Sequence, residues 1–96
     1  MDRHTALTLV SAHKLHLQSQ FGVRSLALFG STARGQAEEG SDVDILISFV
    51  SAPTSKQYFG ARFYLEDVLQ YRVDLVTEKA LRQELRPYVE RDAVHV

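Results

Sequence analysis

Two aspartates, Asp42 and Asp44, stand at the start of an otherwise apolar stretch, DVDILISF (residues 42–49). The later part of this stretch is almost continuously apolar, which is typical of a strand buried in a sheet. Burying an unpaired carboxylate is costly, so both acids are expected at the rim of that sheet. A fold that accepts this stretch must therefore bury its apolar end while leaving its acidic end open.

The rest of the chain predicts helices and strands in alternation, because apolar residues recur at helical spacing in some segments and form short runs in others. Pro87 implies a kink or an early break in the last helix. The final residues, AVHV, either add a short edge strand or have no regular structure. This order predicts an α/β fold, a small mixed sheet flanked by helices, with the strand directions left open. The expected helices span 5–20, 56–70 and 78–91, and the expected strands span 23–29, 42–49 and 72–77. The aromatic residues Tyr58, Phe59, Phe63 and Tyr64 are expected mainly in the core, with room for two of them to face a partner.

Length and composition narrow the class of protein. A chain of 96 residues suits one compact domain, 1–96, with one site. The formal net charge of -1 lacks the basic surface that binds duplex DNA, so strong autonomous DNA binding is not expected. No apolar run reaches membrane-spanning length, and the absence of cysteine fits a reducing compartment. We therefore expect a cytoplasmic protein without a membrane segment.

The acidic residues form a candidate metal site. Asp42 and Asp44 are two residues apart, so on a strand they point to the same face, about 6.5 to 7 Å apart along the backbone. Asp74 stands near the start of another predicted strand, in VDL, and a neighbouring strand would bring it to the same rim. Three converging carboxylates repel one another unless a cation lies between them. Oxygen ligands alone favour Mg²⁺ or Mn²⁺ over zinc.

Gly30 and Ser31 form a candidate phosphate cradle directly after the strand that precedes the acids. Glycine permits close approach of a phosphate to the backbone, and the serine hydroxyl and exposed N–H groups can hydrogen-bond its oxygens. Arg34 either binds phosphate or pairs with Glu38 or Glu39 at the surface. A phosphate cradle beside a metal cluster indicates nucleotide chemistry, in which two metal ions activate a hydroxyl and stabilise the leaving pyrophosphate.

The motifs GSTARG, SDVDIL and VDL resemble those of the nucleotidyltransferase superfamily that includes DNA polymerase beta. That superfamily has a Gly-Ser turn, about ten further residues, an Asp-x-Asp pair and a later single acid on a strand. The small size and the form Gly-Ser-x-Ala-Arg-Gly resemble the minimal nucleotidyltransferase (MNT) proteins, many of which are antitoxins paired with HEPN-domain ribonuclease toxins. The resemblance spans roughly residues 23–96.

The resemblance implies a polymerase beta-like fold and a transfer of AMP from ATP, with Mg²⁺, to a tyrosine of a partner HEPN ribonuclease toxin. Under this reading Gly30 and Ser31 hold the triphosphate and Asp42 and Asp44 ligate two metal ions. Asp74 completes the site, as a third ligand and beside the attacking hydroxyl.

Two other functions remain open at this stage. A non-catalytic antitoxin would neutralise its partner by covering it, and a small-molecule nucleotidyltransferase would need an additional acceptor-binding domain. The intact acids disfavour the first, because binding alone requires no cluster of negative charges. The length of the chain disfavours the second and favours a protein acceptor that supplies its own docking surface.

Overall fold

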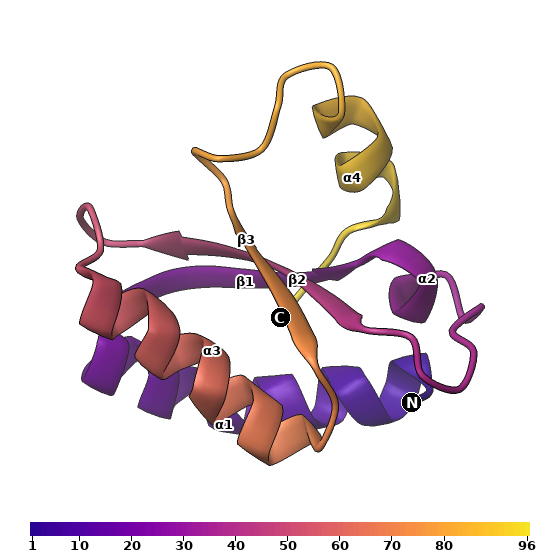
Figure 1. Ribbon diagram of the computed structural model, residues 1–96, viewed down its shortest axis with the longest axis horizontal. Helices are drawn as coiled ribbons and strands as arrows, with labels where there is room; N and C mark the ends of the chain where they lie inside the picture. The colour runs from indigo at the N-terminus through magenta and orange to yellow at the C-terminus, as the bar shows by residue number, and fades with distance from the viewer.

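A four-stranded sheet lies at the centre of the computed structural model, which describes all 96 residues (Figure 1). The strand order is β3-β2-β1-β4. The elements follow in the order α1 (Arg3–Phe21), β1 (Val23–Phe29), α2 (Gly30–Ala33), β2 (Val43–Phe49), α3 (Ser55–Leu69), β3 (Val73–Thr77), α4 (Arg86–Asp92) and β4 (Val94–His95).

The sheet is mixed, as the sequence predicts. Strand β1 pairs antiparallel with β2 on one side and with β4 on the other. Strands β2 and β3 are parallel, and α3 forms the crossover between them. A parallel neighbour needs such a crossover because the chain must return to the same end of the sheet before the next strand begins. The crossover therefore places the starts of β2 and β3 side by side.

Capping residues set the limits of the two long helices. The Asp2 carboxylate accepts a 2.7 Å hydrogen bond from the Thr5 N–H at the start of α1. Thr54 and Gln57 form a reciprocal capping box at the start of α3. None of the helices combines the length and the apolar character needed to cross a membrane.

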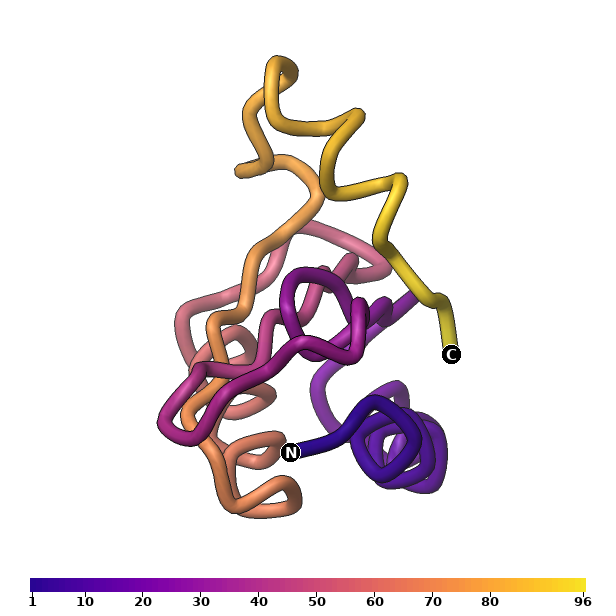
Figure 2. Tube along the Cα trace, turned by 90° about the vertical axis from the view of Figure 1, so that its right-hand side faces the viewer, coloured from indigo at the N-terminus to yellow at the C-terminus, as the bar shows by residue number.

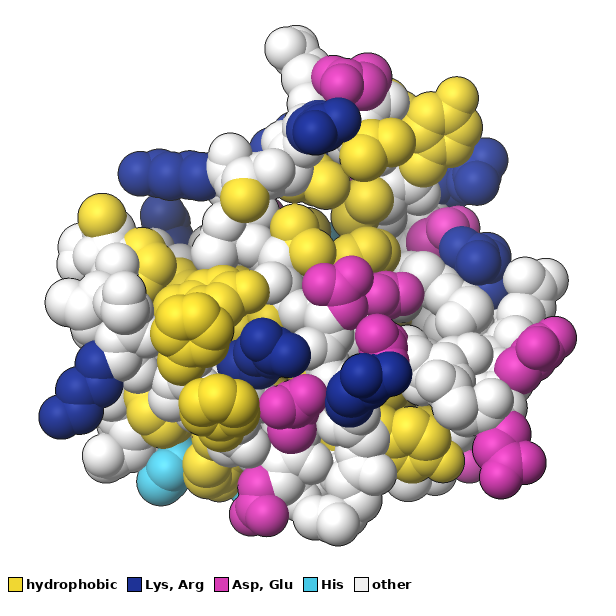
Figure 3. Space-filling view, viewed as in Figure 1, with side chains coloured by type: hydrophobic (Ala, Val, Ile, Leu, Met, Phe, Trp, Pro, Cys, Tyr) yellow, Lys and Arg dark blue, Asp and Glu magenta, His cyan; other side chains and the backbone are white.

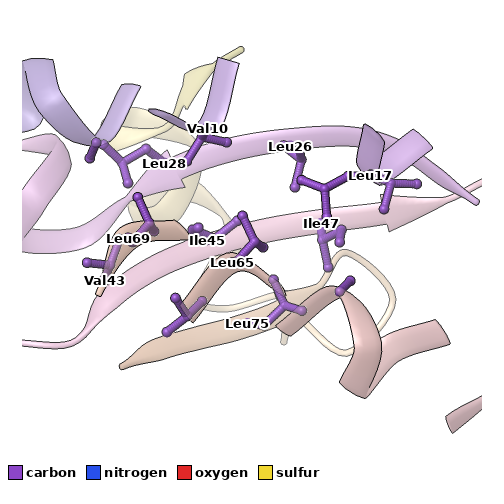
Figure 4. Packing of buried hydrophobic residues seen from close by; sticks show 14 of the residues in the cluster. Val10, Leu17, Leu26, Leu28, Val43, Ile45, Ile47, Leu65, Leu69 and Leu75 are labelled. Carbon is purple, nitrogen blue, oxygen red and sulfur yellow. The ribbon is translucent and has the colours of Figure 1, made fainter. Parts of the chain in front are cut away.

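The hydrophobic core lies between the sheet and the pair formed by α1 and α3 (Figure 4). Alternate residues of each strand point to this face, so Ile45 and Ile47 are almost fully buried. Val10 and Leu17 of α1 and Leu65 of α3 pack against them. Because one face of the sheet supplies this core, the other face is free to carry polar residues.

The segment between β3 and β4 rises above that second face (Figures 1 and 2). The predicted helix over 78–91 is wrong in its first half, because the chain forms turns before α4 begins at Arg86. Pro87 occupies the first turn of α4, where its missing N–H costs nothing, so it begins the helix rather than kinking it. The AVHV residues form the short edge strand β4.

Of the four aromatic residues expected mainly in the core, two pack there and two are exposed, which the expectation allowed. Phe59 and Phe63 of α3 are 44% and 61% exposed, and their rings stack on each other with centroids 6.2 Å apart. They lie one turn apart on the side of the helix that faces away from the sheet. Tyr58 and Tyr64 are partly buried and pack against the core.

The placement of the core predicts that two leucine-to-alanine substitutions, one on each long helix, differ greatly in their effect on stability. Leu65→Ala should lower the free energy of unfolding by about 2 to 5 kcal/mol, because it removes a fully buried side chain and leaves a cavity. Leu15→Ala is the matched control, since Leu15 is 80% exposed on α1 and its loss should change stability by less than about 0.5 kcal/mol. Urea denaturation measures both. Equal losses would contradict this placement of the core.

Candidate active site

The parallel register of β2 and β3 places Asp44 directly beside Asp74. Adjacent strands lie about 4.8 Å apart, and paired residues point to the same face. Val43 and Val73, which flank the pair, are both buried in the core, so both acids project from the opposite face. The sequence-based prediction that a neighbouring strand brings Asp74 to Asp44 matches this register.

Asp42 continues the same pattern one step outward. Its carboxylate forms a 3.5 Å ion pair with the Arg72 guanidinium. Asp42 lies just before β2 and Arg72 just before β3, so this pair neighbours the pair of Asp44 with Asp74. The Arg72 and Asp42 side chains are 82% and 47% exposed, so the pair contributes little to stability. Sequence reasoning missed Arg72, although the matching spacing of Asp42 to Asp44 and of Arg72 to Asp74 was a usable signal.

The electrostatics of Asp44 reflect this crowding. Burial raises the pKa of the Asp44 carboxyl to about 6, and the charge of Asp74, a hydrogen bond with Asp74 and the charge of Asp42 act in the same direction. The Arg34 guanidinium opposes the increase in this pKa. The fold thus disfavours the ionised form of Asp44 in the absence of a cation. Figure 3 shows acidic side chains gathered here, between α2 and β3 and below the segment that carries α4.

The Gly30–Ser31 turn adjoins the acids, because Phe29 at the end of β1 pairs with Asp44. Gly30 has a φ of +72°, which L side chains rarely adopt. A Cβ atom at this position would collide with the Asp44 Oδ2 atom. The glycine is therefore required for the approach of the Asp44 carboxylate, in addition to the approach of phosphate that the sequence suggested.

Arg34 takes neither of the surface acids considered from the sequence. Its Nη1 atom donates a 2.8 Å hydrogen bond to the Asp92 Oδ2 atom, and its Nε atom donates to the Gln36 side chain. This ion pair connects the end of α2 to the end of α4. Asp92 was not identified from the sequence, and nothing in the spacing of these residues, 58 positions apart, indicated it.

The structure thus brings Asp44, Asp74 and Gly30 together and holds Asp42 beside them through Arg72. No three His, Asp or Glu side chains are gathered closely enough to form a metal site. The donor set nevertheless suits a hard cation, because all its ligands are carboxylate oxygens, and burial together with the charges of Asp74 and Asp42 raises the pKa of Asp44. A divalent ion would relieve that repulsion.

A sequence profile of the nucleotidyltransferase domain family matches residues 10–95. The chain belongs to this family. Members use a nucleoside triphosphate as substrate and typically a divalent metal ion. The oxygen ligands and the adjacent Gly-Ser turn agree with that chemistry.

Individual relatives of the nucleotidyltransferase are similar over nearly its whole length. Protein adenylyltransferase MntA of Thermococcus cleftensis is 42% identical over 89 residues, which cover 93% of this chain and 90% of the relative. A solved structure described as a minimal nucleotidyltransferase has a TM-score of 0.82 at 37% identity, covering 98% of this chain and 95% of that one. These likenesses confirm the resemblance drawn from the motifs.

A more distant likeness shows the fold alone. A tri-AMPylated Shewanella oneidensis HEPN toxin in complex with MNT antitoxin matches with a TM-score of 0.64 at 20% identity. The match covers 93% of this chain and 68% of that one. The small mixed sheet with its helices is therefore shared with this more divergent structure.

The glycine at the turn gives a testable contrast. Gly30→Ala should lower the free energy of unfolding by at least about 1 kcal/mol more than Gly35→Ala, because only the first places a Cβ against a packed side chain. Gly35 is the matched control, since its φ of +71° imposes the same backbone strain in open space. Urea denaturation of both variants measures the difference.

A second substitution identifies the cause of the Gly30→Ala effect. Adding Asp44→Ala to Gly30→Ala removes the atoms that the new methyl group would meet, so it should recover most of the excess loss. A loss that persists in the double variant would show that the carboxylate of Asp44 is not the obstacle.

The raised pKa of Asp44 predicts how metal-free stability varies with pH. A carboxyl whose folded pKa exceeds its unfolded value stabilises the fold fully below the unfolded pKa and loses this effect as pH rises through the folded pKa. Here the window runs from 3.8 to about 6. Asp44→Asn, which cannot ionise, should therefore exceed the wild type in stability above the window and lose this advantage below it.

Denaturation midpoints above and below this pH window, with a chelator present, test the prediction. Asp42→Asn is the control, because its exposed ion pair should give only a small change. An advantage of Asp44→Asn that is the same at both pH values would contradict the assignment of the shifted pKa to Asp44.

Proposed function

We propose that this chain is a Mg²⁺-dependent protein adenylyltransferase that moves AMP from ATP to a tyrosine of a partner HEPN-domain ribonuclease toxin, and thereby acts as the antitoxin. The observation that carries the proposal is the pairing of Asp44 with Asp74 beside the Gly30–Ser31 turn. This pairing unites a phosphate-binding turn and a divalent-metal ligand set on one open face of the sheet.

Asp42, Asp44 and Asp74 are the proposed metal ligands, and two Mg²⁺ ions are expected. When bound, Mg²⁺ polarises the phosphoryl oxygens and offsets charge on the leaving pyrophosphate. The ion pair of Asp42 with Arg72 is exposed and weak, so this carboxylate can exchange Arg72 for a metal at little cost. Ser31 and the adjoining backbone N–H groups are proposed to hold the terminal phosphates, with Arg34 near them.

In the transfer step the tyrosine oxygen attacks the α-phosphorus of ATP. A bond forms between these atoms, and the bond from the α-phosphorus to the bridging oxygen of the β-phosphate breaks, releasing pyrophosphate. The phenolic proton passes to the Asp74 carboxylate and from there to water, because Asp74 is exposed at the rim of the sheet. Asp74 therefore acts on the acceptor, whereas Ser31 acts on the donor.

Two relatives support the proposed acceptor. The Thermococcus cleftensis relative is named a protein adenylyltransferase, which supports a protein acceptor. The Shewanella oneidensis complex pairs an AMPylated HEPN toxin with an MNT antitoxin, which supports a HEPN partner and AMP as the transferred group.

Substitution of Asp74 separates catalysis from binding. Asp74→Asn keeps the size of the side chain and leaves Asp42, Asp44 and the Gly30–Ser31 turn to hold Mg-ATP, so binding of Mg-ATP and of the partner should persist, while transfer should fall by at least about a hundredfold. Each variant is incubated with labelled ATP, Mg²⁺ and a HEPN-domain partner protein. Asp67→Asn, an exposed acid on α3, is the control and should retain full activity.

Mass spectrometry of the partner after co-expression distinguishes the remaining functions. An AMP adduct on a tyrosine with the wild type, absent with Asp74→Asn, supports the proposal. A partner that is neutralised by the wild type but never modified would replace it with antitoxin action by binding. Labelled product on a small molecule instead of the protein would replace it with small-molecule transfer.

A further inference from the structure

The structure has one pocket, and this pocket lies away from the acids, at the far end of β2. Its cavity volume of about 380 Å³ falls within the range of small-molecule sites. It lies between the loop after β2 and the stretch after β3, both on the left in Figure 1, while α2 lies on the right. The lining residues that bear on its chemistry include two cations, one carboxylate, hydroxyl groups and a short apolar wall: Arg24, Lys79, Glu78, Ser48, Thr77, Ala52 and Pro53.

The pocket and the acids share a face of the sheet. Ile45 and Ile47 point into the core, so Asp44, Leu46 and Ser48 point to the opposite face. The Ser48 hydroxyl hydrogen-bonds the Ser25 hydroxyl of the neighbouring strand there. Asp44 and Ser48 are four residues apart, which corresponds to about 13 Å along a strand. This separation is comparable with the length of an extended nucleoside monophosphate.

The phosphate turn, the acids and the pocket lie in that order along β2. Phe29, just before the turn, pairs with Asp44, whereas Val23 at the other end of β1 pairs with Phe49 beside the pocket. If the terminal phosphates of a nucleotide lie at the turn and its α-phosphate lies at the acids, its nucleoside must bind elsewhere on the protein. Strand β2 runs from the acids toward Ser48, where the pocket lies.

The chemistry of the pocket suits a nucleoside. The register of β1 on β2 shifts between Val23 and Ser25, so Arg24, at the edge of the pocket, lies at an irregular point of the strand, and such irregularities commonly re-aim a side chain beside a functional site. Neither Arg24 nor Lys79 forms an ion pair with another residue. A guanidinium can stack on a planar base. Ala52 and Pro53 add an apolar wall, and the hydroxyl groups of the pocket can bond the sugar.

We infer that this pocket is the subsite for the base and sugar of the nucleotide donor. The inference rests on the proposed function and extends it, because it assigns the nucleoside to residues that lie outside the three motifs. Arg24 stacks on or hydrogen-bonds the base, and Lys79 closes the open side of the pocket. The triphosphate and the nucleoside are thus held at opposite ends of β2 by separate groups of residues.

Comparison of two probes tests the inference. Mg-ATP contains the nucleoside, whereas Mg-tripolyphosphate contains only the part that binds the turn and the acids. Ala52→Trp places a bulky side chain in the pocket from an exposed loop without changing charge. By calorimetry it should weaken ATP binding by at least about tenfold, the loss expected when a base is denied its stacking site, and leave tripolyphosphate binding unchanged.

A second variant tests the cations by a different route. Arg24→Gln combined with Lys79→Gln should also weaken ATP more than tripolyphosphate. Lys56→Gln is the matched control for loss of positive charge, because Lys56 is exposed at the start of α3 and does not line the pocket. It should affect neither probe.

Unchanged ATP affinity in both pocket variants overturns the inference, and the proposed function then stands if Asp74→Asn still abolishes transfer. Equal weakening of ATP and tripolyphosphate by Ala52→Trp also overturns it, because the pocket would not be specific for the nucleoside. Loss of partner binding with ATP affinity intact would assign the pocket to the partner protein instead. If the wild type binds neither probe, the proposed function fails and the inference fails with it.

Discussion

Two like charges are held side by side on adjacent strands, and the arrangement of the rest of the molecule makes this possible. The pairing of Asp44 with Asp74 requires β2 and β3 to be parallel and in register, which in turn requires the α3 crossover. The repulsion is sustained because the residues on either side of each acid are buried in the core. Burial of apolar residues on one face of the sheet thus offsets the repulsion between the two acids on the other face.

Because one face of the sheet supplies the stability and the other carries the acids, a short chain can maintain a site that opposes folding. Burying a carboxylate and crowding it with others opposes folding, as the raised pKa of Asp44 records. A phosphate-bound metal ion would reverse the sign of that interaction. The site is therefore arranged for a charged ligand rather than for the empty protein, which is common where binding and catalysis are concentrated.

The sequence predicted those parts of the structure that depend on local spacing. The separation of Asp42 from Asp44 and the Gly-Ser turn required no knowledge of the fold, and the apolar periodicity located α1, α3 and the three longer strands. Strand direction and the turns before α4 were not predictable, because they depend on tertiary contacts and on the role of Pro87 as a helix start. The ion pair of Arg34 with Asp92 and the pocket at the end of β2 arise from residues distant in sequence.

The segment that rises above the open face is attached mainly at its two ends. No residue of α4 is buried, and β4 pairs with β1 over only two residue pairs. Arg34 and Asp92 add one ion pair, and Arg86 donates a hydrogen bond to the Glu78 carbonyl. A unit with so few buried contacts opens locally at a lower free energy than the sheet beneath it. The segment between β3 and β4 can therefore open over the acids while the sheet and the core beneath it stay folded.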